Sequence, residues 1–552
     1  MTLSLLVLII GTLWWWNANK GRIIRNKIIS TIYKKTNGLY RANIGKVKVS
    51  FLNGNISVRD IEILYDSVKY AELVKEHSAP PVLMNLRSSR VVLSGVRTKF
   101  FKLKDRLLAK KLQVLDPTVE LLFTHEEKDS VNKKSVKALY RQLLGDMDYI
   151  RFDVALVSNA NVVTKNFQDK KEDFIAKNMN LTLRDVQIDS IGSNDSTRIL
   201  FSKRIAVFSD TVTWYSSARL YKYGFINFTY NTEESDLYLG QLRIEPQLSE
   251  TAFASSFPYQ TDRFDVDLKD IRIKDLDIPH VMKEEVWAQS LDISQIRLKL
   301  YRDLTMPRRP GIKPAENIGE QLMQIPVPLM FHSTNFPSLS FSYRQKGAKS
   351  GDIGDLRFDN SSLFIQNLTN MPEELAHNNI CKIDARTRLL NMLPVSIGMV
   401  LTLGSKDGTF SMEGSTGSGL DLTRLNELTM PMGLNQIKSG QMHSLKFNFN
   451  GNNFGLKGSL TGLYDHLKID FLEYGDDKKI NKRHLGTLLR DLFIRDDNPH
   501  DEDGIRIAKV EPTRDMSRSF YNLLWQGILD GIMTTIVTNR GLPIKTKGFG
   551  AP

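Results

Sequence analysis

The hydrophobic pattern of the chain contains an eight-residue unit that occurs three times. The copies cover residues 56–63, 181–188 and 266–273, and each reads apolar-x-apolar, basic, Asp, apolar-x-apolar. The alternation within each half is typical of a strand with one buried face, but the step of three across the basic–Asp pair would turn the second half to the opposite face. A β-bulge at the pair would restore the face and bend the strand. The repeat therefore predicts curved strands that are apolar on one side.

Alternation also predicts strands near both ends of the chain. Residues 47–51 lead through Asn53-Gly54, a strong hairpin signal, into residues 56–58. Near the C-terminus, apolar residues alternate over 445–449, 454–460 and 467–471, which predicts a three-stranded meander with lysines and asparagines on its other side. A sandwich of two sheets that cover one another is one interpretation of such strands.

Helices that could cover the strands are few, which favours a longer sheet over a sandwich. The helical candidates are residues 22–36, 68–77, 134–146, 485–495 and 516–538. No linker rich in Pro, Gly and Ser separates the strand groups, as would be expected of several domains. We expect a mainly β fold: an elongated, curved antiparallel sheet folded over into a groove, with a few peripheral helices and an N-terminal membrane anchor.

The first 19 residues are expected to form a transmembrane anchor. The segment is apolar and ends in a tryptophan cluster typical of a headgroup interface; its anchoring residues are Leu5, Leu6, Leu8, Ile9, Ile10, Trp14, Trp15 and Trp16. The run is shorter than the ~20 residues that span a bilayer, so a cleaved signal peptide is the alternative. Bulky tryptophans stand where signal cleavage requires small residues, which favours a retained anchor.

Positive charge is concentrated beside this apolar segment. The formal net charge is +13, yet residues 1–50 contain nine Lys or Arg and no Asp or Glu. Residues 20–36 are predicted to be a basic amphipathic helix whose Lys20, Arg22, Arg25 and Lys27 contact anionic headgroups. The basic residues 97–111 would lie on a bilayer or form a solvated helix on the sheet. This clustering argues against a nucleic-acid partner, whose binders spread basic residues along a working surface.

The sequence contains no pattern typical of an active site, a metal site or a cofactor site. Cys381 is the single cysteine, which excludes an intrachain disulfide and predicts a buried, small apolar residue. His125-Glu126-Glu127 lacks the second histidine of a helical zinc site, and the acidic residues 496–504 lack the ligand order of a calcium loop. We therefore expect no catalytic residue, no metal and no cofactor, and a protein that is not an enzyme.

Several segments resemble the AsmA-like envelope proteins of Bacteroidetes-type bacteria. Residues 437–442, 445–449, 458–460 and 463–469 are similar to the C-terminal module of that family, which would cover about residues 330–475. Residues 367–370 and 419–426, and the opening segments 37–40 and 44–47 after the anchor and basic helix, are also similar to it. The resemblance covers most of the chain through patterned rather than invariant motifs.

The resemblance implies a single-pass protein of the bacterial inner membrane with its β-rich body, residues 37–500, in the periplasm, followed by a terminal strand and amphipathic helix over 501–552. The positive-inside rule alone would leave the body in the cytoplasm, and we follow the family. The family also implies phospholipid as partner, and a role in lipid transport between inner and outer membrane or in maintaining envelope composition.

The expected mechanism is an apolar trough in which acyl chains lie while headgroups stay at its open edge. The alternation selects Val47, Val49, Phe51, Ile56, Val58, Leu181, Leu183, Val266, Leu268, Phe447, Phe449, Leu456 and Leu460 as its lining. The alternative is an anchored scaffold that carries no lipid and recruits other envelope proteins for outer-membrane assembly. For the C-terminal helix, closing the end of the core and contacting a membrane or partner are both consistent with its apolar stripe.

Overall fold

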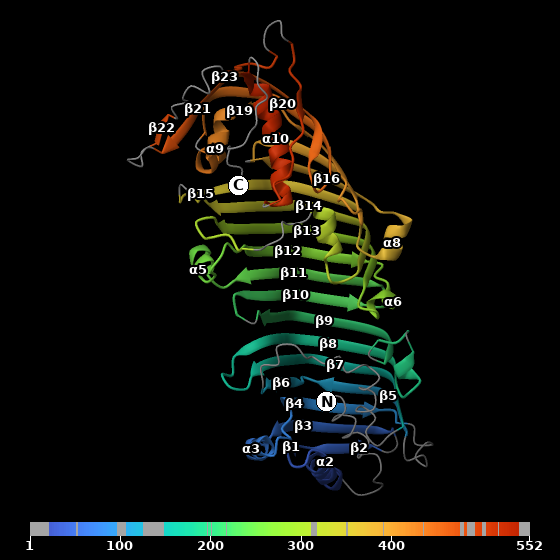
Figure 1. Cartoon of the computed structure of the whole chain (residues 1–552). Coiled ribbons are helices and arrows are strands. Elements are labelled where there is room, and N and C mark those ends of the chain that lie inside the picture. Colours follow the sequence, from blue (N-terminus) through green and yellow to red (C-terminus); the bar gives the residue numbers. More distant parts are fainter. Residues whose placement is uncertain are drawn as a thin grey trace. The chain divides into compact units, whose positions relative to one another are not determined.

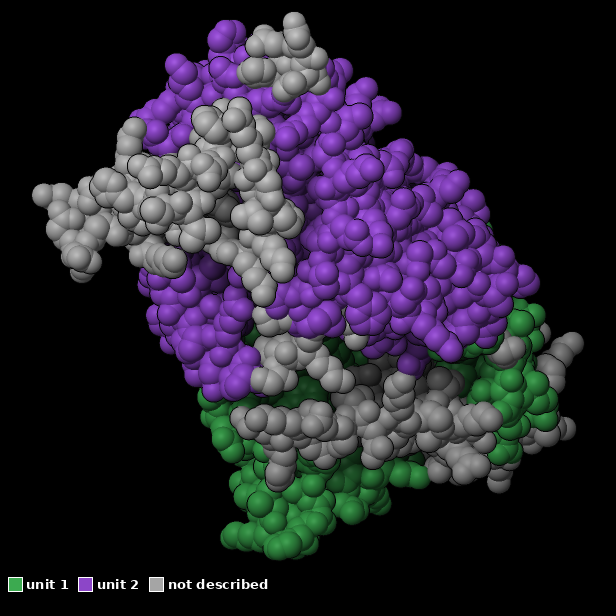
Figure 2. Space-filling view, turned by 45° about the horizontal axis from the view of Figure 1, so that its top comes forward, with its two compact units in different colours: residues 1–243, 272–283 green, residues 244–271, 284–552 purple. Residues whose placement is uncertain are grey.

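A computed structural model describes the chain except at residues 1–20, 51–52, 97–105, 125–147, 196, 200, 217, 311–316, 349–350, 390, 434, 475–479, 483–491, 500–503, 517 and 540–552. The fold is mainly β, with a large mixed sheet and few helices (Figure 1). The chain divides into two compact units. The first two divisions fall within strands β11 (Asp236–Pro246) and β12 (Arg263–Lys274), and the third falls between residues 283 and 284, before the next strand. Unit 1 is residues 1–243 and 272–283, and unit 2 is residues 244–271 and 284–552 (Figure 2).

Unit 1 begins with a helix and continues in strands that pair mostly with their sequence neighbours. Its elements are α2 (Gly21–Lys35), β1 (Tyr40–Ile44), β2 (Val47–Ser50), β3 (Asn55–Tyr65), α3 (Ser67–Lys75), β4 (Val82–Ser94), β5 (Arg106–Leu115), β6 (Thr118–Phe123), β7 (Tyr149–Asn166), β8 (Glu172–Ile188), η2 (Gly192–Asn194), β9 (Ser202–Tyr215), β10 (Tyr221–Asn231) and α6 (Ile278–Val281). β5 and β6 both run parallel to β7, whereas β1 to β4 and β7 to β10 pair with their neighbours in antiparallel ladders.

Unit 2 contains strands that range from two to 19 residues, and the last of the described helices. Its elements are α5 (Glu250–Ser255), β13 (Val286–Asp303), α7 (Ile318–Met323), β14 (Leu329–Lys346), β15 (Ile353–Thr369), α8 (Pro372–His377), β16 (Ile380–Leu389), β17 (Leu393–Thr402), β18 (Phe410–Thr416), β19 (Leu420–Asp421), η3 (Leu422–Leu425), α9 (Asn426–Gly433), β20 (Asn435–Gly451), β21 (Leu456–Tyr474), β22 (Ile480–Lys482), β23 (Leu492–Ile494), β24 (Ala508–Val510), α10 (Phe520–Ile536) and β25 (Val537–Asn539). β13 and β14 are parallel. The expected purely antiparallel sheet is therefore wrong, because connections such as residues 304–328 are long enough to return the chain to the same end.

The three repeated units behave as the pattern predicts in one respect and differ in another. Asp60, Asp185 and Asp270 all have left-handed backbones, with φ of 51°, 53° and 51°. The apolar residues on both sides of each pair share a face: Val58 and Ile61, for example, are both buried. The pairing register of β3 with β4 is nevertheless the same on both sides of Asp60. Strand β4 therefore turns its side chains in the same way as β3 at this point, and the pair needs no bulge in one strand alone.

Other local predictions are confirmed in part. The hairpin through Asn53-Gly54 joins β2 and β3, and helices form at α2, α3 and α10. The meander has two strands rather than three, because β21 continues from Leu456 to Tyr474 through a left-handed residue at His466. The basic helix expected within 97–111 is wrong over its described part, where Leu107 and Ala109 of β5 are buried with period two.

Some predicted segments lie outside the described residues, among them residues 1–19 with the whole expected anchor, Lys20, and the helix at 134–146. Of the helix expected at 485–495, residues 492–494 form a strand instead. The helices of the described part of the chain include none that is both long and apolar enough to cross a membrane.

Candidate functional site

In unit 1, cross-strand pairing brings apolar residues into continuous rows on one face of the strands. Row A runs across β2, β3, β4, β5, β7, β8, β9 and β10 and consists of Val47, Val58, Val91, Val114, Val157, Leu181, Val207 and Tyr230. Row B lies beside it and consists of Val49, Ile56, Leu93, Leu112, Ala155, Leu183 and Ile205. Seven strand spacings of ~4.8 Å make row A about 34 Å long.

Six of the predicted lining residues therefore meet in two adjacent rows of unit 1. Val47 and Val58 lie in row A with Leu181, and Val49, Ile56 and Leu183 lie in row B; Phe51 is outside the described residues. The sequence repeat at 56–63 and 181–188 supplies strands β3 and β8 of both rows.

Burial changes along row A. Val58, Val91 and Val114 are at most 5% exposed and belong to the buried cluster of unit 1. Val157 and Leu181 are partly exposed and pack against the edge of that cluster, whereas Val207 and Tyr230 are partly exposed and belong to no cluster. Among the described residues, none from β10 is part of a buried hydrophobic cluster. Row A thus begins in a core and ends on an accessible apolar surface.

Aromatic side chains dominate that accessible end. The Trp214 ring stacks on Tyr223 with 5.1 Å between centroids and meets Phe225 edge-on at 4.8 Å. Phe225 pairs across the strands with Val212, as Tyr230 does with Val207. All four aromatic side chains are partly exposed. Sequence reasoning missed them, although the alternating aromatic residues of 221–230 carry the signal.

The hydroxyl of Tyr230 is the polar exception in this apolar surface. Its Oη is buried and has no hydrogen-bond partner in the described structure. Burial raises the pKa of Tyr230, so the phenol is protonated at neutral pH and its O–H is a donor. An unpaired buried hydroxyl is unfavourable by about 1–3 kcal/mol, so Tyr230 is a locally unfavourable feature of this part of unit 1.

In unit 2, one apolar row ends beneath a helix. Row D crosses β13 to β18, β20 and β21 and consists of Leu291, Thr334, Ile365, Ile383, Met399, Met412, Phe449 and Gly458. Helix α10 lies across the end of this row (Figure 1). A Cβ atom added at Gly527 would lie 3.0 Å from Leu456 Cδ1, and one added at Gly531 would lie 2.7 Å from Leu460 Cβ.

Four predicted lining residues are therefore core residues under α10. Phe447, Phe449, Leu456 and Leu460 are all buried and share one cluster with Phe520 and Leu523 of the helix. Phe449, Leu456 and Leu460 are at most 2% exposed, so a ligand cannot reach their side chains in this structure. The C-terminal helix closes the end of the core here, which was one of the two roles that its apolar stripe predicted.

Other strands of unit 2 keep an accessible apolar face. Row E consists of Leu298, Phe341, Phe358, Leu389 and Leu393, from β13 to β17. Its first four members are partly exposed, and the Phe341 and Phe358 rings lie nearly parallel with 6.3 Å between centroids. The predicted Val266 and Leu268 on β12 are partly exposed too. No described residue of β13 belongs to a buried cluster.

The predicted headgroup-contacting bases that are described lie on α2. Arg22 and Lys27 are exposed and Arg25 is partly exposed, while Ile28 and Ile32 on the same helix are buried against unit 1. The apolar face of the helix therefore packs on unit 1, and its basic side chains face outward.

Titratable clusters offer little chemistry within the described residues. They contain no group of three His, Cys, Asp or Glu side chains that could hold a metal ion. Burial raises the pKa of the Cys381 thiol to about 11, so this side chain is a protonated core residue at neutral pH.

The chain matches no known protein-family model and no curated protein. The resemblance to AsmA-like proteins accordingly stays a prediction.

Proposed function

We propose that this protein is a membrane-anchored component of the bacterial envelope that binds phospholipid acyl chains on the apolar face of its sheet and supports lipid transport between the inner and outer membranes. This proposal depends mainly on the accessible end of row A. There the apolar side chains of β7 to β10 line up across the strands and are not enclosed in a core. Contiguous exposed apolar surface of this kind marks a ligand, partner or membrane site.

The geometry suits a flexible hydrocarbon chain. A row of Val, Leu and aromatic side chains offers a similar contact at each strand spacing, and each buried methylene contributes about 0.8 kcal/mol. Binding is therefore spread along the row instead of fixed in one deep pocket, which permits sliding.

The basic side chains of α2 support a position near anionic headgroups. Exposed Arg22 and Lys27 would each contribute roughly 1 kcal/mol near such a surface. The expected anchor directly precedes this helix in the sequence.

The test is to purify the full chain in mild detergent and to quantify extracted phospholipid by mass spectrometry. Val207→Asp places a charge in row A, and Ala206→Asp places the same charge on the next residue, which points to the other face of β9. We expect stoichiometric phospholipid with the wild type and with Ala206→Asp, and at least about a fivefold loss with Val207→Asp.

Two results would count against the proposal. Wild-type protein free of phospholipid would favour the scaffold function. Phospholipid that is retained equally by Val207→Asp would place the lipid elsewhere on the chain.

A further inference from the structure

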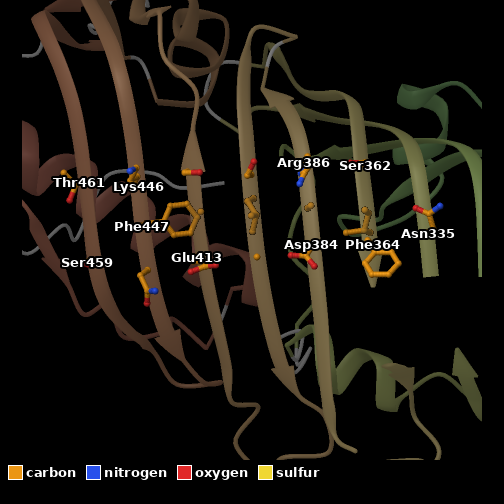
Figure 3. Close-up of a pocket in the computed structure, with 18 residues that line it drawn as sticks. Asn335, Ser362, Phe364, Asp384, Arg386, Glu413, Lys446, Phe447, Ser459 and Thr461 are labelled. Atoms are coloured by element: carbon orange, nitrogen blue, oxygen red, sulfur yellow. The ribbon is translucent and has the colours of Figure 1, made fainter. Parts of the chain in front are cut away.

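Unit 2 carries a second surface, polar and hollowed, that the lipid proposal does not use. The hollow has a volume of about 940 Å³ and lies over strands β14 to β18, β20 and β21 (Figure 3). Its polar side chains come from the positions that alternate with the apolar ones in these strands, so they point to the face opposite row D.

Two rows of polar residues cross the strands in this hollow. The acidic row consists of Asn335, Phe364, Asp384, Gly398, Glu413 and Asn448. The basic row consists of Ser362, Arg386, Ser396, Ser415, Lys446 and Thr461. Small residues separate the charges in both rows: Gly398 stands between Asp384 and Glu413, and two serines stand between Arg386 and Lys446. The small residues make the floor of the hollow and the charged side chains its walls.

The four charged side chains make no bonds to one another. In the described structure Asp384, Arg386, Glu413 and Lys446 are exposed and form no ion pair or side-chain hydrogen bond. Elsewhere in unit 2 acids and bases do pair, as in Arg302–Asp262 at 2.5 Å and Arg344–Glu250 at 2.6 Å. The hollow thus offers acceptors and donors together, all of them available to a ligand.

An aromatic ring stands among these polar groups. Phe364 is 36% exposed, and its strand neighbours on either side are Asn335 and Asp384. An exposed phenyl ring beside carboxylate, amide and hydroxyl groups provides an apolar platform next to hydrogen-bonding partners, the combination that fixes a ligand with both kinds of surface.

We propose that this hollow binds an oligosaccharide. A pyranose ring has an apolar face that would lie on Phe364 and hydroxyl groups that would donate to Asp384 and Glu413 and accept from Arg386 and Lys446. An extended peptide fits less well, because the strands of the floor are already paired on both sides and leave no backbone edge for strand addition. Nucleic acid fits less well because the acidic row would repel its phosphates.

The experiment is to apply the full-length protein to an array of soluble oligosaccharides that includes neutral, N-acetylated and phosphorylated members, and to measure the affinity of each hit by calorimetry. Phe364→Ala should weaken binding by about tenfold or more, and Asp384→Asn and Glu413→Gln should weaken it by several-fold each. Phe454→Ala removes another exposed phenylalanine of unit 2, and Arg388→Ala removes an exposed base on the strand of Arg386, outside the hollow; both should bind as the wild type does.

The proposal fails if no oligosaccharide on the array binds. It also fails if only phosphorylated members bind and Phe364→Ala does not affect them, since that result would indicate simple attraction to Arg386 and Lys446. Because none of these substitutions touches row A, phospholipid content should be unchanged, and failure here leaves the lipid proposal standing.

Discussion

Row A of unit 1 and row D of unit 2 have the same construction and different surroundings. Each crosses eight strands and is built almost entirely of apolar residues. Row D passes through Phe449, which is fully buried near α10, and ends at Gly458, whereas row A ends at Tyr230 with its side chain partly exposed. The difference lies in the cover and not in the strands. An alternating strand specifies that one face is apolar, and a separate segment decides whether that face becomes buried core or stays accessible.

The cover over row D depends on residues that have no side chain. Gly527 and Gly531 are four positions apart, so they lie on one face of α10 and let its backbone approach the sheet. The Phe447 ring likewise lies over Gly414, where an added Cβ would be 2.3 Å from Phe447 Cζ. These close contacts show that the C-terminal core of unit 2 is tightly packed.

Truncating one ring of row D and one aromatic ring near the accessible end of row A should give the largest contrast. Phe449→Ala should lower the stability of unit 2 by about 3–5 kcal/mol, because it leaves a cavity in a closed core. Phe225→Ala, at the accessible aromatic end in unit 1, should lower stability by about 1 kcal/mol, because water already reaches that ring. Hydrogen-exchange protection of β20–β21 and of β9–β10 reports each effect locally. Equal losses at both sites would contradict the distinction between core and surface.

Adding a side chain to α10 should have the next largest effect. Gly531→Leu should destabilise the contact with β21 by about 2–3 kcal/mol, because Leu460 cannot move away without disturbing the cluster. Gly224→Ala is the control, since an added Cβ there meets nothing within 4 Å. A neutral Gly531→Leu, measured by the same exchange experiment, would show that α10 does not pack closely on the strands.

The aspartates of the sequence repeat should have smaller effects. Asp60 has a φ of 51°, which glycine adopts freely and alanine does not. Asp60→Ala should therefore be less stable than Asp60→Gly by about 1 kcal/mol in urea unfolding of the full chain. If the alanine variant were the more stable one, the left-handed step would not be what keeps Val58 and Ile61 on one face.

The smallest expected effect on stability comes from the protonation of His466, an exposed side chain of β21. A hydrogen bond from the His466 ring to Asp465, together with the charge of that carboxylate, raises the pKa of His466. The pair's contribution to stability is fully present below the ordinary histidine pKa of about 6.5 and is lost as pH rises through the higher folded value. An NMR titration of the ring should show the raised pKa, and Asp465→Asn should return it toward 6.5. An unchanged pKa in that variant would exclude Asp465 as the cause.

The sequence predicted the strands better than their cover. The repeat correctly placed Val58 with Ile61 and Leu183 with Val186 on one face, because alternation and the basic–Asp step are local properties. It did not distinguish Leu181 in row A from Phe449 in row D, because the helix over Phe449 lies about 80 residues later in the chain. The parallel pairs of β7 and β13 were missed because pairing direction depends on connections and not on periodicity.

Photocrosslinking can show where on the sheet an acyl chain binds. A phospholipid with a diazirine near the end of one acyl chain would be incorporated into the purified full-length protein, and the labelled peptides would be mapped by mass spectrometry. We expect labels in β7 to β10 around Val157, Leu181, Val207 and Tyr230, and none at Met412 or Phe449, which share a buried cluster with α10. Labels distributed equally over both rows, or absent from row A, would rule out row A as the site of the acyl chain.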